Sequence, residues 1–173
     1  IFLERTQGIG AISAADAVDL GLSGPNLRAC GVPYDVRRSE PYSIYDKLDF
    51  DVPVGARGDC LDRYLVRMEE MRQSLRILKQ AMKGLPAGPC MAANVPKGLR
   101  PPKGEAFVCT ENPRGEFGVY LISDGKDRPY RLKIRGPSFV NLMGLPIMMR
   151  NAYIADAVVI LASIDIVLGD VDR

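Results

Sequence analysis

The chain has 173 residues, enough for one domain with a core of its own. Its 47% hydrophobic and 25% charged composition is that of an ordinary soluble globular protein, and a net charge of +2 without blocks of like charge gives no general reason to expect nucleic acid as a partner. The sequence contains no His, which excludes the usual general base at neutral pH and the commonest transition-metal ligand.

The chain opens IFLERTQGIG, with neither Met nor the pattern of a signal peptide, so we expect a piece of a longer polypeptide. Its four cysteines are Cys30, Cys60, Cys90 and Cys109. Because no two of them form a CxxC pair, a zinc site or a thioredoxin-like motif has no support. We expect free, buried thiols in a reducing compartment.

A short helix is predicted at residues 13–21, where Ser13 suits the N-cap, Asp16 the third helical position and Gly21 the C-terminal stop. Residues 22–58 follow no period, because Pro and Gly interrupt them repeatedly. We expect a long ordered connection that is held to the body by aromatic side chains. These aromatic residues are Tyr34, Tyr42, Tyr45 and Phe50.

The clearest predicted helix covers residues 58–84, with Asp59 as a cap and Gly84 as its end. Its apolar residues recur at intervals of three and four and form one stripe: Leu61, Tyr64, Leu65, Met68, Met71, Leu75, Leu78 and Met82. Arginines make the other side basic: Arg63, Arg67, Arg72 and Arg76. We expect that side to face water, the alternative being an acidic partner surface.

Residues 85–105 are rich in Pro and Gly and predict an exposed connector. Three strand-like runs follow it, AFVCTE, EFGVYLISDG and RPYRLKIRG, separated by the turn residues NPRG and SDGKD. Their alternation of apolar and polar residues predicts a small antiparallel sheet around residues 106–136, with one face buried.

From Phe139 onward the chain is almost wholly apolar, and IMMRNAYIADAVVILAS predicts a helix of about four turns buried in a larger body. With Asp156 and Asp165 in it, AYIADAVVILASIDIVL is too short and too charged for a membrane span. The alternating IDIVL predicts an extended segment. The fold class is therefore α+β, mainly helical with a small antiparallel sheet.

The tail SIDIVLGDVDR, residues 163–173, sets acids and an arginine among Ile, Val and Leu. Termini usually fray unless they are held, and buried charges are costly unless paired. The sequence contains no nucleotide-binding, serine-hydrolase or zinc-peptidase motif. The tail is therefore either a solvated end or part of a site.

Long stretches of the sequence resemble one family, the C-terminal half of the D subunit of respiratory complex I, the proton-pumping NADH:quinone oxidoreductase. These stretches are LSGPNLRACGVPYDVRR, YDKLDFDVPVGARGDCLDRYLVRMEEMRQSLRI, PPKGEAFVCTENPRGEFGVYLISDG, RPYRLKIRGPSFVNL and ADAVVILASIDIVLGDVDR. The resemblance implies that residues 1–173 are the C-terminal portion of this hydrogenase-like large subunit, with the N-terminal half absent. It also implies a fold like that of the large subunit of nickel–iron hydrogenases.

The resemblance further implies a place in an electron-transfer assembly. Members of the family are peripheral subunits close to the membrane, on the cytoplasmic side in bacteria or the matrix side in mitochondria. They pack against the small iron–sulfur subunit and beside the membrane subunit of the quinone channel, and quinone is the substrate reduced there. NADH and the iron–sulfur clusters belong to partner subunits. We expect no cofactor bound by this chain, and no activity from it alone.

Nickel–iron hydrogenases, which resemble that family, end in Asp-Pro-Cys-x-x-Cys-x-x-His. Laid on the tail without gaps, the Asp falls on Asp165, the two Cys on Val167 and Asp170, and the His on Arg173. Because thiolate ligands have become a Val and a carboxylate, we expect no metal centre here. The resemblance implies instead a quinone-reduction chamber, with Asp165, Val167, Asp170 and Arg173 as candidate pocket residues and no catalytic residue in this chain.

The sequence departs from many relatives at two places where they carry a His: Asn141 stands in FVNL, and Asn151-Ala152 precedes the last helix. The quinone-headgroup residues of the family, a His and a Tyr, lie in the N-terminal half. The alternative to a chamber wall is a hydrogenase-like scaffold or assembly subunit without a quinone site. A metal-bearing hydrogenase subunit and nucleic-acid binding through the arginines of residues 63–76 are further alternatives.

Overall fold

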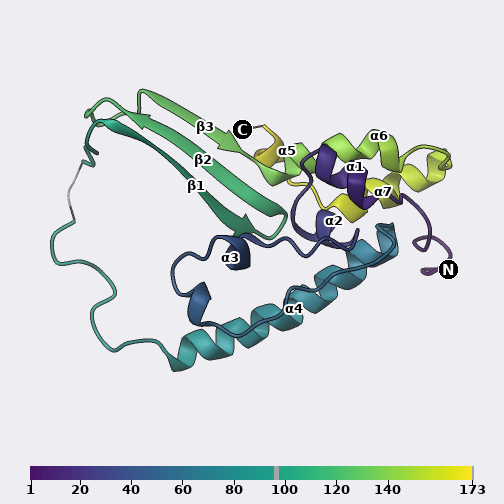
Figure 1. Cartoon of the computed structure of the whole chain (residues 1–173), viewed down its shortest axis with the longest axis horizontal. Coiled ribbons are helices and arrows are strands. Elements are labelled where there is room, and N and C mark those ends of the chain that lie inside the picture. Colours follow the sequence, from purple (N-terminus) through teal and green to yellow (C-terminus); the bar gives the residue numbers. More distant parts are fainter. Residues whose placement is uncertain (96–97, 173) are drawn as a thin grey trace.

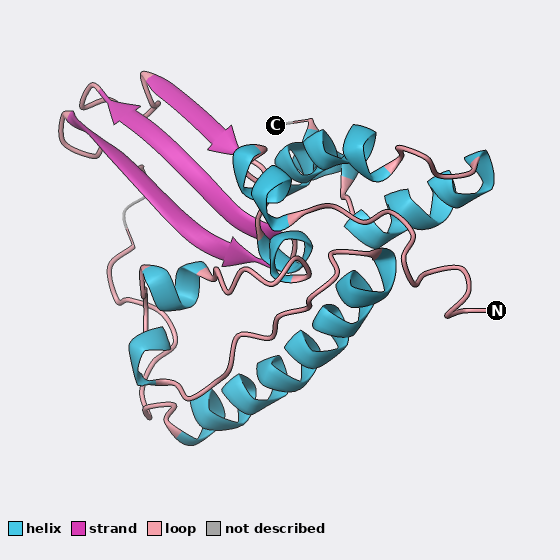
Figure 2. Cartoon of the chain, turned by 45° about the vertical axis from the view of Figure 1, so that its right-hand side comes forward, coloured by secondary structure: helices cyan, strands magenta, loops and turns pink. Residues whose placement is uncertain are grey.

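The computed structural model describes residues 1–95 and 98–172 and has the predicted α+β class. Most of the short helices gather around the start of a long helix, and a sheet projects from them (Figures 1 and 2). The α-helices are α1 (Ala14–Asp19), α2 (Gly24–Arg28), α3 (Val36–Ser39), α4 (Cys60–Lys83), α5 (Pro137–Asn141), α6 (Leu145–Met148), α7 (Ala157–Ile164) and α8 (Leu168–Val171). The 3-10 turns are η1 (Tyr45–Lys47), η2 (Leu142–Gly144) and η3 (Ile154–Asp156), and the strands are β1 (Gly104–Asn112), β2 (Gly115–Ser123) and β3 (Arg131–Arg135).

The helix ends that the sequence predicts from capping residues are confirmed. The Ser13 side chain accepts a hydrogen bond from the Asp16 N–H at 3.1 Å and starts α1. Asp59 does the same for α4, accepting from the Asp62 N–H at 2.8 Å. Gly84 follows the last residue of α4. Each cap satisfies a backbone group that the first or last turn of a helix leaves open.

The predicted solvated arginine side of α4 is wrong for its first two turns. Arg63 is fully buried and donates to the carbonyls of Gly58 and Gly10, at 2.7 and 2.8 Å, while Arg67 is mostly buried beside α7. The later turns lie along residues 49–51 instead of the core (Figure 1). The side chains of the apolar stripe that are half exposed or more include Leu65, Met71, Leu75, Leu78 and Met82. Only the start of α4 therefore packs into the core.

The antiparallel sheet is confirmed, with strand order β1-β2-β3. Its register places one set of mainly apolar side chains on one face: Ala106, Val108, Thr110, Phe117, Val119, Leu121, Leu132 and Ile134. The predicted burial of that face is wrong for this chain, because Val108 and Leu132 are at least half exposed. The sheet meets the helices at the β1–β2 turn, where a Cβ on Gly24 would lie 2.5 Å from the Cα of Gly115.

The predicted four-turn helix near the C-terminus is wrong. The chain leaves α6 and passes through Asn151, whose φ of +60° is left-handed and ends the helical path. It restarts where the Tyr153 N–H donates to Asp156 at 3.2 Å, and α7 follows. Val158 on α7 is exposed, so this helix is not buried on all sides. The predicted extended tail is also short, because α8 begins at Leu168.

The connection predicted to be irregular contains the short helices α2, α3 and η1. Its expected aromatic contacts are present: the ring of Tyr45 lies 5.0 Å from that of Tyr42 and 6.2 Å from that of Phe50, centroid to centroid. Phe50 is buried. The contacts to the body, which the sequence predicts, come from two tyrosines: Tyr34 donates to Glu116 at 2.9 Å, and the Tyr42 hydroxyl accepts from the Glu111 N–H at 3.2 Å.

The core gathers residues from both ends of the chain: Ile12, Ala17, Leu22, Leu27, Cys30, Cys60, Met148, Ile160 and Ile164. Cys30 and Cys60 are free and buried, as predicted, whereas Cys90 is exposed and Cys109 is half-buried, so burial is wrong for those two. Cys90 lies on the connector after α4, which offers it no cover. Within residues 1–95 and 98–172, none of the helices combines the length and the apolar composition that a membrane span requires.

Candidate functional site

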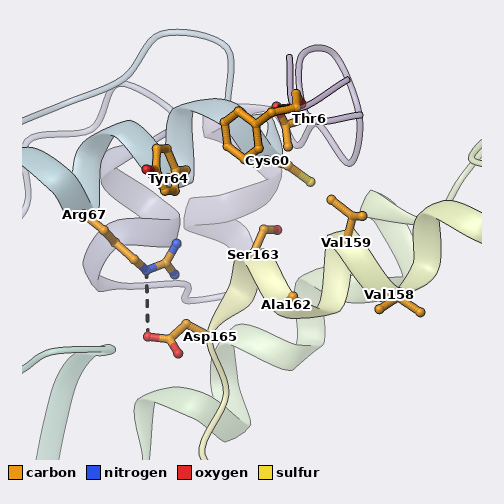
Figure 3. A pocket seen from close by; sticks show the side chains of 10 residues that line it. Thr6, Cys60, Tyr64, Arg67, Val158, Val159, Ala162, Ser163 and Asp165 are labelled. Atoms are coloured by element: carbon orange, nitrogen blue, oxygen red, sulfur yellow. Dashed lines mark hydrogen bonds and ion pairs between the residues drawn. The ribbon is translucent and has the colours of Figure 1, made fainter. Parts of the chain in front are cut away.

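A cavity of about 370 Å³ lies between the N-terminal segment, α4 and α7; we call it the α4–α7 cavity (Figure 3). Its apolar wall consists of Phe2, Tyr64, Val158, Val159 and Ala162. Its polar wall consists of Thr6, Arg67, Ser163 and Asp165, and Cys60 completes it. This mixture of a large apolar wall with a few placed polar groups is typical of sites for small organic molecules.

Asp165 sits at the end of α7 because the chain turns there with a φ of +60°. Asp tolerates this left-handed conformation better than most residues. Arg114, from the β1–β2 turn, donates to the Asp165 carbonyl at 3.2 Å and to its carboxylate at 3.3 Å. The Nε of Arg67 lies 3.9 Å from the other carboxylate oxygen. The dashed line in Figure 3 marks this ion pair. The Asp165 carboxylate is thus held between two guanidinium groups.

Only two of the three guanidinium nitrogens of Arg67 have hydrogen-bond acceptors among the residues that the structure describes. Its Nη1 donates to the Arg63 carbonyl at 3.0 Å and its Nη2 to the Ile164 carbonyl at 3.1 Å. Its Nε is buried and has no hydrogen-bond acceptor within the described part of the chain. Burial lowers the pKa of Arg67 to about 10, so it is still a cation at neutral pH.

The predicted tail residues are divided between two cavities. Val167 and Asp170 line a second cavity of about 350 Å³, with Arg114 and Phe117 on its sheet side; we call it the tail–sheet cavity. Asp165 lines the α4–α7 cavity, and Arg114 connects the two by its hydrogen bonds to Asp165. The structure therefore does not bring Asp165, Val167 and Asp170 around one cavity.

The Asp170 carboxylate already has a backbone partner. It accepts a hydrogen bond at 2.7 Å from the Ser138 N–H, at the start of α5. The approach is so close that a Cβ on Gly136 would collide with the Asp170 carbonyl oxygen and lie 2.6 Å from its Oδ1. The fourth predicted residue, Arg173, lies outside the described residues.

A buried ionic cluster lies near Arg67, whose positive charge interacts with the carboxylate of Glu70. Arg28 donates at 2.8 Å to Glu70 and at 2.9 Å to Glu111, and its guanidinium lies 3.8 Å from Asp35. Burial raises the pKa of both glutamates, although Arg28 opposes the effect. Such clusters rigidify a fold when every member is paired.

A cavity of about 570 Å³ adjoins this cluster. Its wall includes Arg28, Glu70 and Glu111, and it shares Tyr64 and Arg67 with the α4–α7 cavity. Arg67 therefore stands between an apolar cavity and a charged one.

Sequence reasoning missed Arg67 and Arg114 as site residues, because the first belonged to a basic helix side and the second to a predicted turn. It also left Asn141 without a role. Asn141 is buried, accepts from the Ser23 N–H at 3.1 Å and donates to the Arg114 carbonyl at 2.8 Å. It thereby fixes the turn from which Arg114 reaches Asp165.

The residues on the tail do not fit a metal centre. The side chain of Val167 offers no ligand atom, and Asp170 is engaged by backbone. Among residues 1–95 and 98–172, no three His, Cys, Asp or Glu side chains come together as a metal site requires.

The exposed apolar faces of α4 and of the sheet are the kind of surface that other protein segments or chains cover. The chain belongs to the family of the 49 kDa subunit of respiratory-chain NADH dehydrogenase, whose sequence model matches residues 1–97 and 93–173. The predicted membership of the family of the complex I D subunit is thereby confirmed.

Relatives named as the D subunit of NADH-quinone oxidoreductase cover the chain from end to end. The protein from Syntrophobacter fumaroxidans is 52% identical over 173 residues, which are 100% of this chain and 46% of the relative. That of Bacillus mycoides is 54% identical over 172 residues, 99% of this chain and 47% of the relative. The corresponding protein of a Roseiflexus species is 54% identical over 180 residues, and the match covers 100% of this chain and 48% of the relative. The chain thus spans about half the length of these relatives.

Proposed function

We propose that this chain is part of a proton-translocating NADH:quinone oxidoreductase and contributes a wall of the chamber in which quinone is reduced. The observation that carries the proposal is Asp165, held at an apolar cavity between Arg67 and Arg114. An apolar wall suits a quinone ring with its hydrocarbon tail, and a few polar groups orient its oxygens. The relatives, which are NADH-quinone oxidoreductase subunits by name, support the reaction class.

In this proposal the chain binds no cofactor of its own. Electrons from NADH reach the quinone through iron–sulfur clusters in partner subunits, of which the small iron–sulfur subunit and the quinone-channel membrane subunit are the neighbours. The chain is a peripheral subunit with a hydrogenase-like fold, on the cytoplasmic side of a bacterial membrane or the matrix side of a mitochondrial one. The exposed apolar stripe of α4 and the apolar face of the sheet are surfaces available to such neighbours.

A second candidate function is that of a scaffold or assembly subunit without a quinone site. The observation in its favour is that Asp170 caps α5 and Val167 lies in a separate cavity from Asp165. In that case the tail stabilises a subunit interface, and its acids have structural partners only.

Photo-crosslinking of an azido-quinone to the intact complex, followed by peptide mapping of this subunit, separates the two functions. We expect the label within residues 158–172, the segment that contributes to both the α4–α7 cavity and the tail–sheet cavity. Competition by unlabelled quinone is the control for specific occupancy. Label confined to other parts of the complex would support the scaffold function.

A further inference from the structure

The buried Nε of Arg67 needs an acceptor. An unpaired donor of this kind is costly, and more so when it carries charge, so native proteins rarely leave one without a purpose. Its neighbour Asp165 is too far for a direct hydrogen bond at 3.9 Å, and its carboxylate already accepts from Arg114. Arg67 also lines the charged cavity, but Glu70 and Glu111 there already accept from Arg28. We therefore take the α4–α7 cavity, which Asp165 lines as well, as the space from which an acceptor approaches.

The walls of this cavity restrict the kind of molecule that supplies the acceptor. Phe2, Tyr64 and Val159 present apolar surface, so the body of the ligand is apolar. The Asp165 carboxylate already offsets part of the positive charge of Arg67 and Arg114, so the acceptor need not be an anion and a neutral carbonyl oxygen is sufficient. The volume of about 370 Å³ is within the range of small-molecule sites. An uncharged ring that carries a carbonyl group fits all three conditions.

We propose that Arg67 is a specificity-determining residue whose Nε donates a hydrogen bond to a carbonyl oxygen of the quinone in the α4–α7 cavity. This inference rests on the proposed function and deepens it by naming the cavity and the contact. The other two nitrogens of Arg67 donate to the carbonyls of Arg63 and Ile164, so the guanidinium group is oriented before a ligand binds. A donor oriented in advance binds at a low entropic cost.

The test uses Arg67→Lys in the intact complex, with Arg63→Lys as the matched control. Both arginines lie on α4, are largely buried and donate to backbone carbonyls, but Arg63 has all three of its nitrogens bonded, one of them to Ser163. Lysine keeps the positive charge and loses the Nε–H. The measurements are KM and kcat for a water-soluble short-chain quinone, with NADH–ferricyanide activity as the measure of assembly.

We expect Arg67→Lys to raise the KM for quinone about tenfold, the loss typical of one hydrogen bond to a charged group. NADH–ferricyanide activity should not change. Arg63→Lys should lower both activities together without raising KM. An unchanged KM in Arg67→Lys, or an equal rise in Arg63→Lys, would overturn the inference.

A second variant covers the case in which Arg67→Lys does not assemble. Ala162 is an exposed position on α7 that lines the same cavity, so Ala162→Leu fills the cavity without disturbing the core. We expect it also to raise the KM for quinone, and an unchanged KM would show that quinone does not occupy this cavity. Azido-quinone label on residues 158–172 together with a normal KM in Arg67→Lys would refute the role of Arg67 alone. Absence of label from the whole chain would refute the proposed function as well.

Discussion

Arg114 holds Asp165 by two hydrogen bonds, one to its carbonyl and one to its carboxylate. The contact joins the β1–β2 turn to the end of α7 across 51 residues of sequence. It also determines the geometry of both cavities, because Asp165 lines the α4–α7 cavity and Arg114 the tail–sheet cavity. The left-handed backbone of Asp165 is stabilised by these bonds at a position where most residues are strained.

The variant Asp165→Asn tests the charge without changing the shape, because Asn tolerates the left-handed conformation equally well. It leaves Arg67 and Arg114 without their shared anion. We expect quinone reductase activity of the intact complex to fall about tenfold, since a hydrogen bond to a charged group contributes about 1.5–3 kcal/mol. NADH–ferricyanide activity should be retained. The control is Asp172→Asn, at an exposed position of the same tail; equal effects of the two variants would count against a specific role.

Asn141 should prove structural. In Asn141→Ala the Ser23 N–H loses its acceptor in a buried setting, and the Arg114 carbonyl loses its donor in a partly buried one. We expect the free energy of unfolding of the chain to fall by about 1–3 kcal/mol, as measured by urea denaturation. The exposed Asn94→Ala is the control and should have little effect. A loss in Asn141→Ala no larger than in this control would contradict the role.

The parts of the fold that sequence predicts are those fixed by neighbours along the chain. Ser13 and Asp59 cap their helices through groups three residues away, and the β1–β2 turn is set by its own residues. The burial of Arg63 depends instead on the carbonyl of Gly10, 53 residues away. Periodicity alone therefore assigns Arg63 to the solvated side. The predicted four-turn helix is wrong for a related reason. The apolar pattern of that stretch does not show that Asn151 adopts a left-handed backbone conformation, which interrupts the helix.

The candidate site follows the same rule. The tail suggested Asp165 because acids among apolar residues require partners, and the structure supplies Arg67 and Arg114. Neither partner could be identified from the sequence, because each lies on a different element and only the fold brings them to α7. Asp170 had the same sequence signal, yet its partner is the backbone of Ser138. A charged residue among apolar ones thus predicts that a partner exists, but it does not predict whether that partner is a side chain or the backbone.

Gly136 should be intolerant of any side chain. Its backbone is ordinary, so the cause is steric: a Cβ would collide with the Asp170 carbonyl oxygen and lie 2.6 Å from its Oδ1. We expect Gly136→Ala to displace the tail from α5 at a cost of about 1–3 kcal/mol. Hydrogen exchange of the backbone amides in residues 165–172 measures the displacement. Gly84→Ala is the control, because its Cβ would have nothing nearer than 3.6 Å; similar exchange in the two variants would rule out the steric explanation.

Stability at low pH should depend on Asp62. Burial would raise its pKa, but the N–H groups of Ala56 and Arg57, at 2.9 and 2.7 Å, hold the pKa below its usual range. A carboxyl with a lowered pKa stabilises the fold above the ordinary Asp value of about 3.9, and this contribution is lost as the pH falls through the folded value. We expect the difference in unfolding free energy between the wild type and Asp62→Asn to shrink from pH 7 to pH 3.

Urea denaturation at the two pH values measures this difference. Asp19→Asn, at an exposed site on α1, is the control and should show little difference at either pH. A gap between the wild type and Asp62→Asn that stays constant with pH would exclude the proposed linkage.

Val167 provides a test of the tail–sheet cavity that is independent of charge. Its backbone is extended, with a φ of −117°, so a larger side chain is tolerated there, and the residue is only partly covered. In Val167→Phe the ring projects into the cavity lined by Arg114 and Phe117. We expect the intact complex to change its sensitivity to quinone-site inhibitors severalfold, as filling a pocket typically does, while NADH–ferricyanide activity is retained. Equal loss of both properties would indicate misassembly, and the tail would then be interface structure.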